Sequence, residues 1–219
     1  MFSFFKKQKV SINSVEVPDF GWKVLQKNSS VIQWINPEET TAISVNFFNR
    51  PPDIPTIKDL DLLRATYRKG ISSANGGLIK VVIGKIKDIP VAKTIFKIPE
   101  EPSGMSYLAS LTIPFEDCSF VIKVQCVEAG STGMRDAVIA TTLMASGELT
   151  IGENGYENWF SDPYDPDFKD GTLMNKSEQE IYDSQFPNHP LAQARKLIEK
   201  IANEVNFKSE IEKLSVLSR

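Results

Sequence analysis

The chain has 219 residues, a formal net charge of -3 and 41% hydrophobic residues. This length and composition fit one large globular domain, or one domain with an appended subdomain. No block of lysine and arginine resembles a nucleic-acid footprint, and no apolar run reaches the roughly 18–20 residues that span a bilayer. We therefore expect neither nucleic-acid binding nor a transmembrane segment.

Residues 1–14 are expected to form an N-terminal tail. Phe2, Phe4 and Phe5 precede the basic residues Lys6 and Lys7, which is the reverse of the order in a secretory signal. Such a terminus could touch a membrane surface weakly, but the pattern is more typical of a frayed or lightly packed end.

Three short strands are expected next, over residues 22–26, 30–35 and 40–48. In the third of them apolar residues recur with a period of two, which is typical of a strand with one buried face. Three prolines between positions 51 and 55 then stop the sheet. Thr56 can cap a helix that we place over residues 56–75.

Four further strands are predicted, over residues 78–86, 89–98, 105–113 and 118–128. Alternate residues of the last strand, from Cys118 to Cys126, form an apolar face that we expect to be buried. Along an extended strand these two thiols lie roughly 26 Å apart, too far for a disulfide. Two unpaired thiols fit a reducing compartment, so we expect a cytoplasmic protein.

A second helix is expected over residues 132–145, and it completes a domain that we assign to residues 15–147. Helical spacing would give it a buried side made of Met134, Val138, Thr141 and Ala145.

The C-terminal residues 177–219 are expected to form helices. Ser177 and Glu180 would make a capping box at the start of a short helix. His189 and Pro190 mark the start of a longer one, whose apolar side would be Leu191, Ala194, Ile198, Ile201 and Val205. A last helix would carry Phe207, Ile211, Leu214 and Leu217. Self-association through these helices, giving a homodimer, remains an alternative.

Strands, a helix, more strands and another helix in this order predict an α+β fold. We expect a curved antiparallel sheet of about six to seven strands covered by helices, with a C-terminal helical extension. The stretch GGLIKVVIGKIKDIPVAKTIFKIP followed by YLASLTIPFEDCSFVIKVQCVE resembles the Mog1/PsbP-like sandwich, over roughly residues 15–147. That resemblance implies a binding or assembly factor more than an enzyme.

Residues 148–176, here called the aromatic-acidic segment, follow the domain. Residues 152–170 hold five aromatic side chains and six carboxylates, and prolines at 163 and 166 give them no helical or strand period. Such a segment either docks on the parent domain or stays partly exposed and binds a partner. In the second case its acidic residues would select a partner with a basic surface. We expect a contact with a protein partner through Trp159, Phe160, Asp162, Tyr164, Asp165 and Asp167.

Two weaker binding sites are also considered. The sequence DPDFKDG resembles part of a calcium loop, but the twelfth position is Lys176 instead of an acid, so only a looser calcium site made of Asp162, Asp165, Asp167 and Asp170 remains. Ser131, Thr132, Gly133 and Arg135 lie at a helix start that could hold an anion, although a tight turn needs the same residues.

No catalytic set is recognisable. His189 is the only imidazole and is expected to cap a helix, and one histidine with two distant cysteines cannot make the usual zinc site. We therefore expect a non-enzymatic, cytosolic accessory, chaperone-like or immunity-type protein that captures another protein and needs no cofactor. The alternative is an enzyme or small-ligand binder that uses carboxylates and Arg135 in a pocket between sheet and helices.

Overall fold

The computed structural model describes residues 9–153 and 155–219. The weak membrane contact considered for Phe2, Phe4 and Phe5 lies outside these described residues. Residues 12–14, which we assigned to the tail, form the short 3-10 helix η1 (Ile12–Ser14), and Ile12 is buried in the main core.

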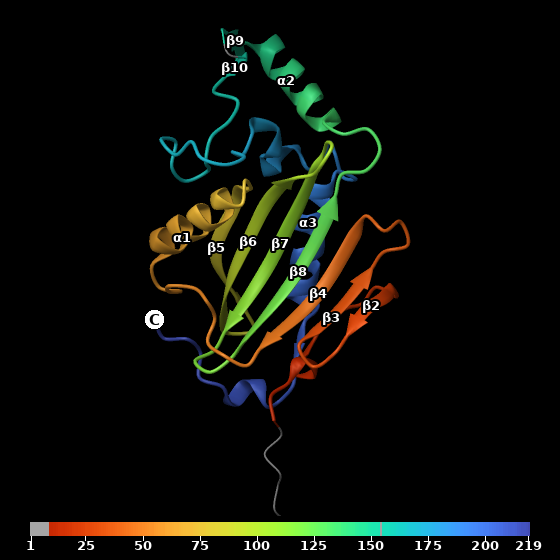
Figure 1. Ribbon diagram of the computed structural model, residues 1–219, viewed down its shortest axis with the longest axis vertical. Coiled ribbons are helices and arrows are strands. Elements are labelled where there is room, and N and C mark those ends of the chain that lie inside the picture. Colours follow the sequence, from red (N-terminus) through yellow and green to blue (C-terminus); the bar gives the residue numbers. More distant parts are fainter. Residues whose placement is uncertain (1–8, 154) are drawn as a thin grey trace, which may run out of the picture.

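A seven-stranded sheet forms the centre of the molecule (Figure 1). Every pair of neighbouring strands is antiparallel, as predicted. From edge to edge its strands are β2 (Lys23–Lys27), β3 (Val31–Ile35), β4 (Thr41–Phe48), β8 (Ser119–Val127), β7 (Met105–Pro114), β6 (Ile89–Pro99) and β5 (Gly77–Ile86). The α+β fold with a C-terminal helical extension is thereby confirmed.

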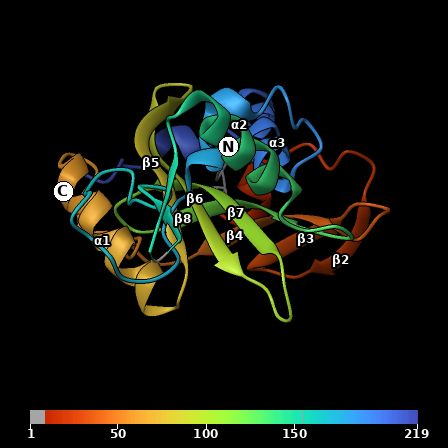
Figure 2. The ribbon, with the colours of Figure 1, turned by 90° about the horizontal axis from the view of Figure 1, so that it is seen from above.

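Two helices cover opposite faces of this sheet. The helix α3 (Pro190–Glu204) crosses one face behind β7 and β8, whereas α1 (Leu60–Ser73) lies in front of β5 (Figures 1 and 2). The predicted apolar side of α3 is confirmed, because all five of its residues from Leu191 to Val205 are buried. α1 packs through Leu63 on a separate cluster with Leu78 and Val81.

The sheet register explains why one face accepts α3. Ile43, Val124, Ala109 and Ile95 lie opposite one another on four adjacent strands, and all are buried in the same cluster as α3. Side chains in one such row point to the same face of a sheet. The alternation in β8 is confirmed as well, since Cys118 and Cys126 are both buried and unpaired.

The helix α2 (Met134–Ser146) departs from the prediction in the side that it buries. Met134, Val138, Thr141 and Ala145 are exposed, whereas Arg135, Ile139, Ala140 and Leu143 are buried. The reason is that α2 does not lie on the sheet. It projects beyond the strand ends (Figure 1) and packs on Leu149 and Trp159 from the segment that follows it. Apolar residues occur on both sides of this helix, so the period alone could not select one.

The aromatic-acidic segment contains a regular element that the sequence did not predict. The strands β9 (Thr150–Gly152) and β10 (Gly155–Glu157) pair as a small antiparallel hairpin beside α2 (Figure 1). We call α2, this hairpin and the chain up to residue 160 the α2 arm. The rest of the segment runs back over the domain without regular structure until residue 175.

Three local predictions were wrong in detail. α1 is capped by Asp59, whose side chain accepts from the Leu62 N–H, while Thr56 stabilises the preceding turn. The capping box lies at Asn175 and Glu178, at the start of η2 (Lys176–Glu178), and the chain continues through η3 (Glu180–Tyr182). The last predicted helix is instead β11 (Asn206–Phe207), paired with β1 (Val15–Glu16), and η4 (Ile211–Lys213). Pairing with β1 is a tertiary contact that local sequence cannot specify.

Within residues 9–153 and 155–219, no helix combines the length and the apolar character that crossing a bilayer demands.

Candidate functional site

The aromatic side chains of the α2 arm divide into a buried anchor and exposed neighbours. Trp159 is 4% exposed and packs in the cluster with Ile139 and Leu143. Tyr156 and Phe160 contact the Trp159 ring, with centroids 5.7 and 6.4 Å away, yet they are 42% and 55% exposed. Trp159 therefore holds the two exposed rings in place and is not itself available to a partner.

The acidic part of the segment is fastened to α1. Nη2 of Arg68 lies 3.1 Å from Asp162 and Nη1 lies 3.1 Å from Asp165. The Tyr164 hydroxyl accepts from the Val81 N–H at 2.8 Å, and its ring lies under the Arg64 guanidinium. Of the residues expected to meet a partner, Phe160 and Asp167 remain on the surface, whereas Asp162 is buried.

These ion pairs also bear on the looser calcium site. Asp162 and Asp165 each direct a carboxylate oxygen at Arg68, and a bound cation would have to compete with that guanidinium. Among the described residues no group of three His, Cys, Asp or Glu side chains is arranged to hold a metal ion.

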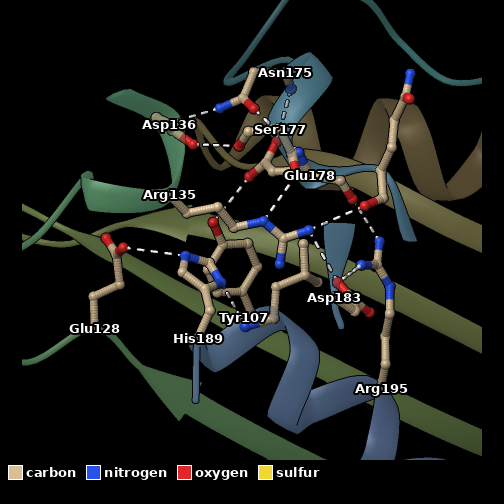
Figure 3. Close-up of polar contacts among 12 residues, drawn as sticks. Tyr107, Glu128, Arg135, Asp136, Asn175, Ser177, Glu178, Asp183, His189 and Arg195 are labelled. Atoms are coloured by element: carbon tan, nitrogen blue, oxygen red, sulfur yellow. Dashed lines mark hydrogen bonds and ion pairs between the residues drawn. The ribbon is translucent and has the colours of Figure 1, made fainter. Parts of the chain in front are cut away.

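Arg135, expected to hold an anion at the start of α2, instead points inward and is 1% exposed. Its Nε donates to the Ser177 carbonyl at 2.8 Å, and Nη2 donates to the Gln179 carbonyl at 3.0 Å and to Asp183 at 2.9 Å (Figure 3). Ser131 and Gly133 stay on the surface. The guanidinium therefore ties α2 to residues 177–183.

Arg135 belongs to a buried polar network that we call the polar junction. Asp183 also receives Nη1 of Arg195 from α3, at 2.8 Å. Asn175 donates to Asp136 at 3.0 Å, and Ser177 donates to the same carboxylate (Figure 3). The polar junction comprises Lys97, Tyr107, Arg135, Asp136, Asn175, Ser177, Glu178, Asp183 and Arg195.

Glu178 connects the polar junction to the sheet. Its carboxylate lies 2.8 Å from Nζ of Lys97 on β6 and accepts from the Tyr107 hydroxyl of β7 at 2.9 Å. Lys97 and Glu178 are each 1% exposed. Burial, together with the nearby Glu178 charge, raises the pKa of Tyr107 well above its ordinary value. The hydroxyl therefore stays protonated and serves as a donor.

A cavity of about 340 Å³ opens beside this network, between the first turns of α2 and α3. His189 caps α3, with Nδ1 accepting from the Leu191 N–H, and Nε2 lies 3.3 Å from Glu128 at the end of β8 (Figure 3). Burial acts to raise the pKa of Glu128, but His189 and the Gly133 N–H hold that pKa below its usual value. The capping role predicted for His189 is confirmed.

Four residues of the polar junction were not predicted from the sequence: Lys97, Glu178, Asp183 and Arg195. One signal was present at Lys97, which shares a strand face with Ile95 and Val91 in the alternation of β6. A lysine at such a position is expected to have a buried counter-charge. Nothing in the local sequence indicates that Glu178, 81 residues further on, supplies it.

Comparisons with known proteins find distant structural similarity alone. No family model and no curated protein matches this chain. A mutant of the protein Mog1 is similar over 89% of this chain and 90% of its own, with 9% identity and a TM-score of 0.43. A crystal structure from Bacteroides thetaiotaomicron is similar over 50% of this chain and 37% of its own, with 14% identity and a TM-score of 0.33.

Proposed function

We propose that this protein is a non-enzymatic, cytoplasmic factor that captures another protein through the α2 arm. The observation that carries the proposal is the position of its exposed apolar side chains. Met134, Val138, Ile151, Tyr156 and Phe160 all belong to this arm and are each at least 42% exposed. Exposed apolar side chains that gather in one region are typical of protein interaction sites.

The helix of the arm is anchored along one side, which favours binding through the other side. Met134 and Val138 lie one turn apart on the same side of α2, and the opposite side is anchored by Leu143 and Trp159. A rigid aromatic or apolar side chain loses little entropy on binding, so it suits an interface anchor.

The nearby acids define the kind of partner. Glu153 and Glu157 lie in the arm itself, and Asp167 and Asp170 are exposed in the loop that follows it. Carboxylates around an apolar contact favour a partner surface that carries lysine or arginine at its rim. The buried, unpaired Cys118 and Cys126 support a reducing compartment.

The test is a pull-down from native lysate that compares three proteins. The variant Tyr156→Ala/Phe160→Ala removes two exposed rings and leaves the Trp159 anchor, so it should lose a partner that the wild type retains. The matched control Val24→Ala/Leu25→Ala removes two side chains of similar exposure, 51% and 49%, from the edge strand β2, and it should retain that partner. If the arm variant and the control capture the same proteins as the wild type, the proposal is wrong.

A further inference from the structure

Another cavity lies on the face of the sheet opposite α3 and is lined by hydroxyl groups. Its volume is about 190 Å³, and we call it the β4–α1 cavity because the loop between those two elements forms one wall. Ser119 of β8, Thr112 of β7 and Tyr67 of α1 also line it. Phe120 and Ile113, the residues that follow the first two, are buried in the cluster beneath α3. Because side chains alternate between the faces of a sheet, Ser119 and Thr112 point the other way, into this cavity.

The hydroxyls of the β4–α1 cavity are buried but can still be reached. Ser119 is 2% exposed and has no hydrogen-bond partner among the described residues, yet its oxygen is not one of the fully sealed, unpaired side-chain atoms. Burial raises the pKa of Tyr67, while the side chain of Thr112 acts the other way, so the phenol stays protonated near neutral pH. Unused hydrogen-bonding capacity in a buried hydroxyl is costly, so a ligand that pairs with Ser119 would be stabilised.

The loop from β4 to α1 adds one charge of each sign. Arg50 and Asp53 both line the cavity. Both are exposed, and neither side chain has an ion-pair or hydrogen-bond partner among the described residues. The loop itself is fastened, because Nη2 of Arg219 donates to the Pro52 carbonyl at 3.1 Å and the Ile57 N–H donates to the Arg219 carbonyl at 3.0 Å. A fastened loop loses little entropy when a ligand binds to it.

Together these groups match a neutral ligand that carries several hydroxyls. A guanidinium only donates hydrogen bonds, a carboxylate only accepts them, and a hydroxyl does both. The charges of Arg50 and Asp53 cancel, so an uncharged ligand leaves neither of them opposed. Phe48, Ile54 and Val121 supply an apolar wall, and the Phe48 side chain is 37% exposed. A ring with hydroxyls at its edge and C–H groups on its faces suits both the polar and the apolar walls.

We propose that the β4–α1 cavity binds a pyranose sugar. The sugar hydroxyls would donate to Asp53 and accept from Arg50 and Ser119, and one C–H face of the ring would lie on the apolar wall. The cavity is compact, which suits a single ring, and an adjoining cavity of about 310 Å³ shares Asp53, Ile54 and Tyr67 with it. The site uses no residue of the α2 arm, so it is independent of the capture of a protein.

The experiment is an NMR titration of the isotope-labelled full-length chain with D-glucose, D-galactose and D-mannose, each added separately. At least one of them should bind with a Kd of about 10 mM or tighter and shift the amide signals of Thr112 and Val121. The analogue 2-(hydroxymethyl)tetrahydropyran keeps the ring but only one hydroxyl, and it should bind at least roughly tenfold more weakly because the other hydrogen bonds are lost. Absence of shifts with all three sugars at about 100 mM overturns the proposal, as does equally tight binding of the analogue.

A matched pair of variants locates the binding site. Asp53→Asn removes the exposed carboxylate that accepts from the sugar, and it should raise the Kd at least roughly fivefold. Asp88→Asn removes an exposed carboxylate from the β5–β6 turn, outside the cavity lining, and should leave the Kd unchanged. Ser119→Ala removes only the buried hydroxyl and should also raise the Kd. If Asp53→Asn and Ser119→Ala bind the sugar as tightly as the Asp88→Asn control does, the proposal is wrong.

Discussion

The two regions that hold α3 are stabilised in opposite ways. Along most of its length α3 rests on aliphatic rows of the sheet, through side chains such as Ile198 and Ile201. At its start the same helix enters the polar junction, where buried Arg195 forms an ion pair with the half-buried Asp183. Apolar burial is stabilising without precise partners, whereas buried charges are tolerated only when each has its counterpart. Substitutions in the first region should therefore lower the free energy of unfolding gradually, as more apolar surface is removed. In the second region the loss of a single charge should lower it sharply.

The largest expected effect is the loss of one partner in the polar junction. Glu178→Gln keeps the shape of the side chain but leaves Lys97 buried without its counter-charge, and should lower the free energy of unfolding by roughly 3–5 kcal/mol. Adding Lys97→Met removes the stranded charge and should recover more than half of that loss. Urea unfolding of the single and double variants measures both values. Equal losses of stability in the single and double variants would show that the unpaired charge of Lys97 does not cause the loss.

A somewhat smaller loss is expected in the apolar region. Ile201 is 0% exposed where α3 meets the sheet, and Ile201→Ala should cost roughly 2–5 kcal/mol through lost burial and an unfilled cavity. Lys97→Met should not restore any of it, which is the sharpest contrast with the polar junction. Ile181→Ala, at a side chain that is 70% exposed, is the control and should stay within about 0.5 kcal/mol of the wild type. If adding Lys97→Met to Ile201→Ala restored stability, the proposed difference between the two regions would be wrong.

The smallest expected effect concerns ionisation on the apolar face. Burial raises the pKa of Cys118 and of Cys126 from 9.0 to about 11. At pH 8 the thiolate population of the native protein should consequently be about 100-fold lower than that of the unfolded chain. Alkylation rates measured with and without denaturant give this ratio. Because both thiols prefer the neutral form in the fold, stability should fall as the pH rises above 9. Equally fast alkylation in the two states would contradict burial as the cause.

The same contrast explains which features of the fold could be predicted from the sequence. The strands, the antiparallel order and the apolar side of α3 were predictable, because a period of two or of 3.6 records which side of an element is buried. The buried side of α2 was predicted wrongly because apolar residues occur on all sides of this helix, so the period of 3.6 does not select one of them. Capping moved from Ser177 to Asn175 because the glutamate three residues after Asn175 is the one drawn into the interior.

The sequence by itself determined the layered α+β architecture and the buried thiols of β8, since both follow from local periodicity. Only the tertiary structure decided which charges meet, because the partners of Lys97, Arg135 and Arg195 lie on elements distant in the chain. It also decided that Trp159 anchors the α2 arm while Phe160 faces solvent. Neighbouring residues with similar side chains carry no local signal of which one the fold will bury, and only packing against a distant surface separates them.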